Sequence, residues 1–261
     1  MNLKFIFLAV AAFFITTLPG AAQLRTISYA DGNQKLNGVL SAPVNNTNKQ
    51  NGGILILPAW KGIDASSRKY AMALSDSGYY VFIADIYGEG NYPSDSREAG
   101  ERSSFYKTHR DQYLHRIRLA LEQLVNAGAD SARIVIAGYC FGGLGAIEAA
   151  RANMPVKGIA SFHGSYDRDT SGPVTLIKPK MLILHGNDDP YASEEQIAAF
   201  RKELTVAKAD WQLNIYANAV HAFTDINAGS DNSKGAAYNE TAAKRSWDAL
   251  LQFISECFGQ Q

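Results

Sequence analysis

A cysteine occupies the middle of residues 138–143, GYCFGG, where the sequence changes from strand-like to helix-like. Residues 133–137 are mostly apolar and β-branched, whereas the small residues after 143 favour a helix. So sharp a turn strains the backbone of its central residue, and glycines two positions away on either side avoid collisions. The start of a helix favours a thiolate through its dipole and free N–H groups. Cys140 is therefore predicted to be a nucleophile, with the N–H of Phe141 donating to the oxyanion that its attack creates.

The residues that would activate this thiol follow later in the chain. An apolar run at 181–185 leads into HGNDDP, residues 185–190, and His221 stands in the sequence AVHAF. The order nucleophile, acid, histidine is typical of hydrolases with this strand–turn–helix motif. A neutral His221 would take the thiol proton and later return it to the leaving group, while the acid orients the ring. The spacing after the glycine favours Asp189 as that acid and leaves Asp188 as the alternative.

Other residues are candidates for the substrate pocket. Tyr87 begins a polar segment, residues 87–104, whose glycines and proline predict a loop or lid that sets specificity. His163 directly follows a predicted strand, and ligands of open α/β sheets bind beyond the carboxyl ends of the strands. Two interpretations of His163 stay open, a pocket residue or a structural one.

The elements that must position these groups alternate along the chain. Residues 25–29 and 35–41 flank Asp31-Gly32 and predict a hairpin. Continuous apolar runs predict strands buried on both faces, and amphipathic runs predict helices. The predicted strands that follow are 53–57, 79–84, 133–137, 156–162, 181–185 and 211–216, and the helices are 66–78, 106–127, 143–153, 194–204 and 241–258. This alternation predicts an α/β fold, with a mostly parallel central sheet and helices on both faces.

The first 22 residues have the pattern of a signal peptide. A short, weakly positive start is followed by an uncharged apolar run at 5–16, and small residues end at Ala22. The run is shorter than the roughly 20 apolar residues that span a membrane. We predict a signal peptide at 1–22 and one mature domain at 23–261, periplasmic or secreted and not held at the membrane after cleavage. An uncleaved membrane anchor is the alternative.

Charge and cysteine content limit the possible partners. Lys and Arg number 25, Asp and Glu also 25, and no basic run with interleaved aromatic residues is present. We therefore expect no nucleic-acid partner. In an oxidising compartment Cys140 and Cys257 could instead form a disulfide, and this alternative to a free catalytic thiol stays open.

The motifs together resemble those of the dienelactone hydrolase family of α/β-hydrolases. The matching segments are 138–143, 185–190 and 221–223, with LPAWKG at 57–62 and ADIYG at 84–88. The likeness extends over essentially the whole mature chain. It implies an α/β-hydrolase fold, ester or lactone hydrolysis, and a second oxyanion donor at the N–H of Trp60.

The sequence departs from this family at three places. The family's founding activity opens a lactone that carries a carboxylate, which two arginines bind; those places here hold Glu89 and Asp225. Acids would repel an anionic ligand. Ala59 replaces the glutamate with which the family tunes its resting cysteine. Glu89 and Asp225 are therefore expected at a pocket for an uncharged or cationic ester rather than dienelactone, unless both point to solvent.

We therefore predict an enzyme that cleaves a small-molecule ester, lactone or thioester through an acyl-cysteine intermediate. The reaction needs neither a metal nor an organic cofactor, because the thiol, the imidazole and water supply its steps. A non-hydrolytic ligand-binding or thiol-redox protein on the same scaffold is the alternative.

Overall fold

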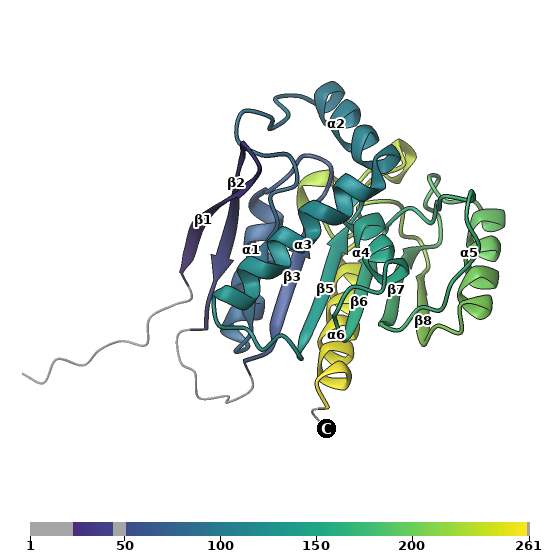
Figure 1. Cartoon of the computed structure of the whole chain (residues 1–261). Coiled ribbons are helices and arrows are strands. Elements are labelled where there is room, and N and C mark those ends of the chain that lie inside the picture. Colours follow the sequence, from purple (N-terminus) through teal and green to yellow (C-terminus); the bar gives the residue numbers. More distant parts are fainter. Residues whose placement is uncertain (1–22, 44–50, 260–261) are drawn as a thin grey trace, which may run out of the picture.

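One eight-stranded sheet forms the centre of the computed structural model, which describes residues 23–43 and 51–259 (Figure 1). Its strands are β1 (Leu24–Asp31), β2 (Gln34–Ser41), β3 (Gly53–Leu57), β4 (Tyr80–Ile83), β5 (Ile134–Tyr139), β6 (Gly158–Phe162), β7 (Lys180–Gly186) and β8 (Trp211–Tyr216). They lie in the order β1-β2-β4-β3-β5-β6-β7-β8. β1 and β2 form the predicted hairpin, β2 pairs antiparallel with β4, and the other pairings are parallel. The predicted signal peptide, residues 1–22, lies outside the described residues.

Helices cover both faces of the sheet, which confirms the predicted fold class. They are α1 (Ala65–Asp76), α2 (Ser96–Thr108), α3 (Arg110–Asn126), α4 (Phe141–Arg151), α5 (Glu194–Val206) and α6 (Glu240–Cys257), with two short 3-10 helices, η1 (Ile226–Ala228) and η2 (Asn232–Lys234). Alternate strand residues face two cores. Leu55 and Phe82 pack with side chains of α3, α4 and α5, whereas Ile54 and Val81 pack with those of α1 and α6.

The chain reverses its direction across the sheet at β3. From β3 it crosses to β4 on one side and then returns to β5 on the other. In open α/β sheets such a reversal leaves a crevice at the carboxyl ends of the strands, where ligands bind. The loops after β3 and β5 border this crevice, and Figure 1 shows α2 at the same end of the sheet.

Residues 87–127 differ from the prediction. Part of the predicted lid is helix α2, whose first turn is capped by the side chain of Asp95. α2 buries only Ala99, Ser103 and Tyr106, so its apolar stripe is too narrow to show as a helical period in the sequence. The predicted helix 106–127 is broken at His109, whose ψ of 61° separates α2 from α3. The break lets α2 leave the line of α3, which packs on the sheet.

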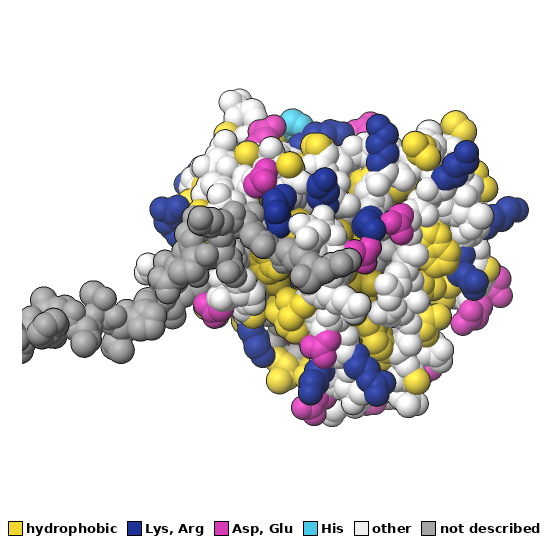
Figure 2. Space-filling model, turned by 90° about the horizontal axis from the view of Figure 1, so that it is seen from below, with side chains coloured by type: hydrophobic (Ala, Val, Ile, Leu, Met, Phe, Trp, Pro, Cys, Tyr) yellow, Lys and Arg dark blue, Asp and Glu magenta, His cyan; other side chains and the backbone are white. Residues whose placement is uncertain are grey.

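The surface seen from below Figure 1 is mixed in charge. Figure 2 shows Lys and Arg side chains interspersed with Asp and Glu on that face, and neither sign forms an extended patch there. Among the described residues, no helix has both the length and the apolar character needed to cross a membrane.

Candidate active site

Cys140 lies between the end of β5 and the first turn of α4, as the sequence predicts. Its φ of +54° is in the left-handed region, which costs a non-glycine residue roughly 1–3 kcal/mol. A Cβ atom at Gly138 would lie 1.9 Å from the carbonyl oxygen of Gly142, and one at Gly142 would lie 2.1 Å from that of Leu57. Neither position can hold a side chain, so the two glycines let the turn close and bring the loop after β3 against α4.

A continuous hydrogen-bonded chain joins Cys140, His221 and Asp189. The Sγ atom of Cys140 lies 3.0 Å from Nε2 of His221, and Nδ1 of His221 lies 2.9 Å from Oδ2 of Asp189. The other oxygen of this carboxylate accepts the N–H of Tyr191 at 2.9 Å. Through Nε2 the imidazole can exchange a proton with the thiol, while Asp189 fixes the orientation of the ring.

Two adjacent acids on the loop after β7 have different surroundings. The side chain of Asp189 is 2% exposed and faces His221, whose own side chain is 16% exposed. Asp188 is exposed, and its carboxylate accepts a hydrogen bond from the side chain of Asn187. The structure thus places Asp189, and not the alternative Asp188, against the imidazole.

The electrostatics of the site favour an ion pair between Cys140 and His221. Burial raises the pKa of the Cys140 thiol, but the hydrogen bond and charge of His221, with the N–H of Phe141 and the ammonium of Lys107, leave this pKa lowered. Burial lowers the pKa of His221, whereas its hydrogen bonds to Asp189 and Cys140 raise it to about 10. Each charged form stabilises the other across 3.0 Å, so thiolate and imidazolium are favoured over the neutral imidazole expected from the sequence.

The two predicted oxyanion donors border the nucleophile. Phe141 begins α4, and its N–H is directed at the thiol of Cys140. Trp60 lies in the loop after β3, and no acceptor among the described residues is bonded to its N–H. The close approach of Gly142 to Leu57 brings this loop against the start of α4. Both amides are therefore available to a carbonyl oxygen placed at the thiol.

Tyr87 supports this oxyanion loop from behind. Its hydroxyl donates to the carbonyl oxygen of Trp60 at 2.6 Å, and its ring stacks on Phe141 with an interplanar angle of 11°. Tyr87 also lines a pocket of about 440 Å³, whose lining includes none of Cys140, His221 or Trp60. The structure thus places this predicted pocket residue between the site of the thiol and a separate hollow.

His163 lies beside the imidazole of His221 and is 3% exposed. The two rings meet edge to face, with centroids 5.1 Å apart. Nε2 of His163 is hydrogen-bonded to Oγ1 of Thr224 at 2.9 Å, which ties it to the loop that carries His221. Burial holds the pKa of His163 well below its ordinary value, so the ring is neutral. Of the two interpretations that the sequence left open, the geometry favours the structural one.

Glu89 and Asp225 are both held by partners outside the lining of the 440 Å³ pocket. Glu89 forms an ion pair with Lys35 at 2.8 Å and accepts a hydrogen bond from Asn37 at 2.7 Å. Asp225 caps η1 and accepts a hydrogen bond from Ser66 at 2.9 Å, which links η1 to α1. That pocket is separate from the nucleophile, so the expectation that these acids repel an anionic substrate stays a prediction.

Two residues near the site were not identified from the sequence. The ring of Tyr191 meets His221 edge to face at 5.1 Å and is 61% exposed. Lys107, on α2, helps lower the pKa of Cys140. The position of Tyr191, two residues after Asp189, was a usable signal. Lys107 gave none, because the break at His109 that sets the course of α2 was not foreseen.

Neither a disulfide nor a metal site is formed by the Cys, His, Asp and Glu side chains of the described residues. Cys140 and Cys257 are both free thiols. Cys257 packs beside Gly158 at the amino end of β6, whereas Cys140 follows the carboxyl end of β5. No group of three or more His, Cys, Asp or Glu side chains in the described chain is arranged to hold a metal ion. The disulfide and thiol-redox alternatives thus find no support in the geometry.

Residues 36–258 of this chain match the sequence model of the dienelactone hydrolase family. A Salmonella typhimurium protein named "Putative carboxymethylenebutenolidase" is 24% identical over 80% of this chain and 78% of its own. A Bradyrhizobium protein named "Probable 2-oxo-3-(5-oxofuran-2-ylidene)propanoate lactonase" is also 24% identical, over 77% of this chain and 82% of its own.

A solved structure is similar over most of the fold. It is a dienelactone hydrolase-like promiscuous phosphotriesterase from metagenomic libraries, with a TM-score of 0.85 and 31% sequence identity. The alignment covers 91% of this chain and 99% of that one. The two chains therefore share the same overall fold over most of their length.

Proposed function

This chain belongs to the dienelactone hydrolase family and is a carboxylic ester hydrolase, and on that premise we propose that it forms an acyl-cysteine intermediate on Cys140. The observation that carries the proposal is the hydrogen-bonded chain from Cys140 through His221 to Asp189. The names of two relatives, a carboxymethylenebutenolidase and a lactonase, support ester or lactone bonds as the substrate class, and a thioester would react by the same steps.

In the first half-reaction the Sγ atom of Cys140 attacks the substrate's carbonyl carbon. The N–H groups of Trp60 and Phe141 donate to the oxyanion of the tetrahedral intermediate. As this intermediate collapses, the imidazolium of His221 gives its proton to the departing alcohol or thiol. An acyl group then remains on Cys140 as a thioester, and the imidazole is neutral.

In the second half-reaction water takes the place of the departed alcohol. Nε2 of His221 removes a proton from this water while the water oxygen attacks the thioester carbonyl carbon. The carboxylic acid leaves, and Cys140 departs as a thiolate beside the imidazolium. The ion pair of the resting enzyme is thereby restored, so one cycle consumes one water and one ester bond.

The thiol is proposed to be ionised before the substrate arrives. The lowered pKa of Cys140 and the raised pKa of His221 support this state. Ala59 stands where the family has a glutamate that tunes the resting cysteine, so a carboxylate at that place does not act on Cys140.

We propose an uncharged substrate rather than a carboxylate-bearing lactone. The family's two substrate-binding arginines are absent, and Glu89 and Asp225 at those places are held by Lys35 and Ser66. The phosphotriesterase named among the similar structures adds an uncharged phosphotriester to the compounds that merit a trial.

Export to the periplasm or the medium is a further part of the proposal. It is supported by the apolar run at 5–16 and the small residues that precede Gln23. N-terminal sequencing of the exported protein should then begin at Gln23.

Hydrolysis of short p-nitrophenyl esters tests the nucleophile. The unaltered protein should release p-nitrophenol and carry an acyl group on Cys140 that mass spectrometry detects after rapid acid quenching. Cys140→Ala should lower kcat/KM by roughly 10⁴-fold or more, as removal of a triad nucleophile does. The matched control is Cys257→Ala, which removes the other thiol and should keep full activity. Equal hydrolysis by the Cys140→Ala variant would exclude Cys140 as the nucleophile.

A further inference from the structure

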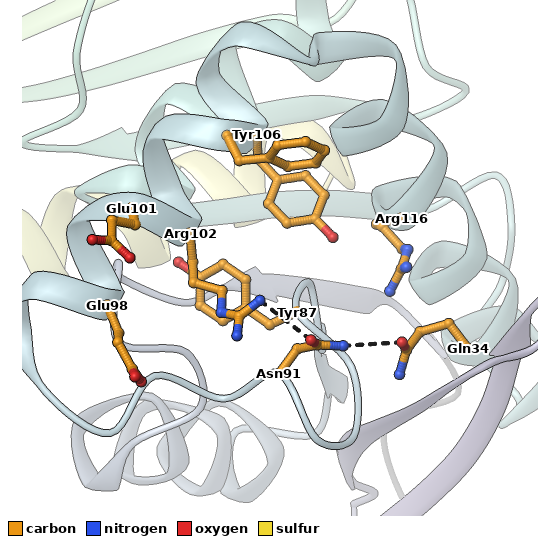
Figure 3. Close-up of a pocket in the computed structure, with 9 residues that line it drawn as sticks. Gln34, Tyr87, Asn91, Glu98, Glu101, Arg102, Tyr106 and Arg116 are labelled. Atoms are coloured by element: carbon orange, nitrogen blue, oxygen red, sulfur yellow. Dashed lines mark hydrogen bonds between the residues drawn. The ribbon is translucent and has the colours of Figure 1, made fainter.

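A hollow beside Tyr87 has a lining that includes neither the nucleophile Cys140 nor Trp60 of the oxyanion loop. Figure 3 shows its lining residues, which come from α2, α3, β2 and the loop after β4. Its volume is about 440 Å³, enough for a small organic molecule. The lining residues are Gln34, Tyr87, Asn91, Glu98, Glu101, Arg102, Phe105, Tyr106 and Arg116.

Three of the four charged lining residues already have charged or polar partners. Arg116 donates to the carboxylate of Asp31 at 2.7 Å. Glu98 accepts two hydrogen bonds from Ser94, and Glu101 pairs with Arg97 at 2.7 Å. These contacts satisfy hydrogen bonds of the three groups, although the carboxylates of Glu98 and Glu101 keep their negative charge at the rim of the pocket.

Arg102 is the exception in this pocket. Nη1 donates to the side-chain oxygen of Asn91 at 3.2 Å. Alongside the hydrogen bonds from Ser94, its charge also helps to lower the pKa of Glu98, but Arg102 forms no ion pair within 4.0 Å among the described residues. The residue is half-buried on α2. A partly desolvated guanidinium with most of its five N–H donors unused is suited to bind a planar oxyanion with two parallel hydrogen bonds.

Aromatic side chains supply the rest of the pocket. Tyr87 and Tyr106 are buried, and Phe105 is 43% exposed and stacks on His109. Figure 3 shows the Tyr106 hydroxyl directed into the pocket, between the guanidinium groups of Arg102 and Arg116. No hydrogen-bond partner for this hydroxyl occurs in the described part of the chain, so it is free to donate.

We propose that this pocket binds a small aromatic carboxylate. The carboxylate accepts hydrogen bonds from Arg102 and from the Tyr106 hydroxyl, and the ring of the ligand packs against Tyr87 and Phe105. An uncharged amide of the same shape lacks the negative charge that the guanidinium requires, so it binds much more weakly.

Occupancy of the pocket would affect catalysis through Tyr87, an inference that rests on the proposed function. The Tyr87 hydroxyl donates to the carbonyl oxygen of Trp60, whose N–H is a proposed oxyanion donor. A ligand ring packed against Tyr87 displaces this side chain and lengthens its hydrogen bond to Trp60. Loss of the bond loosens the loop after β3, so the bound carboxylate lowers kcat and leaves KM unchanged.

Direct binding is measured first, with benzoate as the probe and benzamide as its uncharged counterpart. The Cys140→Ala variant is used, so that the result does not depend on hydrolysis. Saturable binding of benzoate, with benzamide at least about tenfold weaker, is the expected result. Equal binding of the two compounds, or no saturable binding of benzoate, overturns the proposal.

Variants then locate the bound probe. Arg102→Met should weaken benzoate binding about tenfold or more, and Arg102→Lys, which keeps the charge without the fork, should weaken it less. The matched control is Arg118→Met, an exposed arginine of α3 outside the lining, which should bind benzoate as the parent does. Thermal unfolding of each variant verifies that it is folded. Unchanged binding by folded Arg102→Met excludes this site.

Steady-state kinetics on a p-nitrophenyl ester test the coupling. Benzoate should lower kcat with KM unchanged, and Tyr87→Phe, which cannot bond Trp60, should still bind benzoate but lose this response. A rise in KM alone would place benzoate at the nucleophile and overturn the second site. Absence of any hydrolysis would instead contradict the proposed function and leave the binding result intact.

Discussion

Cys140 and Cys257 occupy opposite ends of the same sheet. Cys140 follows β5 at the carboxyl end, whereas Cys257 ends α6 beside Gly158, the first residue of β6. Gly158, beside Cys257, pairs with Val135 of β5, and Cys140 lies five residues further along the chain. The two thiols are therefore separated along the strand direction by roughly 16 Å at 3.3 Å per residue. A disulfide requires Cα atoms within about 7 Å, so the two thiols cannot pair without a large rearrangement.

The surroundings of the two thiols have opposite effects on their acidity. At Cys257 burial dominates and, with the nearby Glu256, raises the pKa to about 12. At Cys140 burial also acts, but His221, the N–H of Phe141 and Lys107 outweigh it and lower the pKa. The comparison shows that the strand–turn–helix site and its histidine, rather than burial itself, make one of the two thiols reactive.

The largest expected difference is in alkylation. The pKa of Cys140 lies below its ordinary 9.0 and that of Cys257 near 12, so at neutral pH the thiolate fractions differ by about 10³-fold or more. Iodoacetamide should therefore modify Cys140 much faster than Cys257, as peptide mass spectrometry can measure, although by less than the ratio of thiolate fractions because the more acidic thiolate is the weaker nucleophile. The rate at Cys140 should rise with pH through its lowered pKa and then stay flat.

Replacement of the histidine sharpens this comparison. In His221→Asn the imidazolium that favours the thiolate is lost, so the pKa of Cys140 should rise and its alkylation should require higher pH. Alkylation at Cys257 should not change and is the internal control. Similar rates at the two cysteines in the unaltered protein would contradict the assigned acidities.

A second, smaller effect is expected at the two adjacent acids. Asp189→Asn should lower kcat by roughly 10²- to 10⁴-fold, because the amide cannot stabilise the imidazolium and favours the wrong tautomer of His221. Asp188→Asn removes the same charge one residue earlier and should change kcat less than about twofold. Steady-state kinetics at neutral pH compare them, and equal losses would show that net charge on the loop matters rather than the contact with His221.

The smallest effect is expected at His163. His163→Ala removes the edge-to-face contact with His221 and the bond to Thr224, which together are worth about 1–2 kcal/mol, and should lower kcat about tenfold with little change in KM. His163→Phe keeps an aromatic ring beside His221 and should lower kcat only about threefold. The pH dependence of kcat is the second measurement, because a looser His221 should lose part of its raised pKa. If folded His163→Ala has the same pH dependence of kcat as the unaltered protein, then His163 has no influence on the imidazole of His221.

Residues that act locally were predictable from the sequence. The continuous apolar runs of β3 and β5 and the glycines on either side of Cys140 satisfy steric requirements within a few residues. The strand–helix alternation then placed the nucleophile, the acid and the histidine at one end of a parallel sheet. This explains why the fold class and family were predicted and why the structure brings Cys140, Asp189 and His221 together.

Residues whose role depends on distant partners were not predictable. The carboxylate of Glu89 faces Lys35, which lies on a hairpin far earlier in the chain. α2 has a polar sequence, and only its tertiary contacts with the loops around Tyr87 make Ala99 and Tyr106 buried. The pocket beside Arg102 exists because His109 interrupts the helix, and a single residue of that kind leaves no pattern in the sequence.

The position of β8 at the rim of the sheet has a consequence for the working lifetime of the enzyme. His221 is carried by the loop after this strand, which pairs only with β7 and has a half-exposed Ile215. Edge strands open more readily than central ones, at a free energy well below that of global unfolding. Transient fraying of β8 would withdraw the base from the thiol while the other strands stay paired. We therefore expect activity to be lost on heating before the core melts.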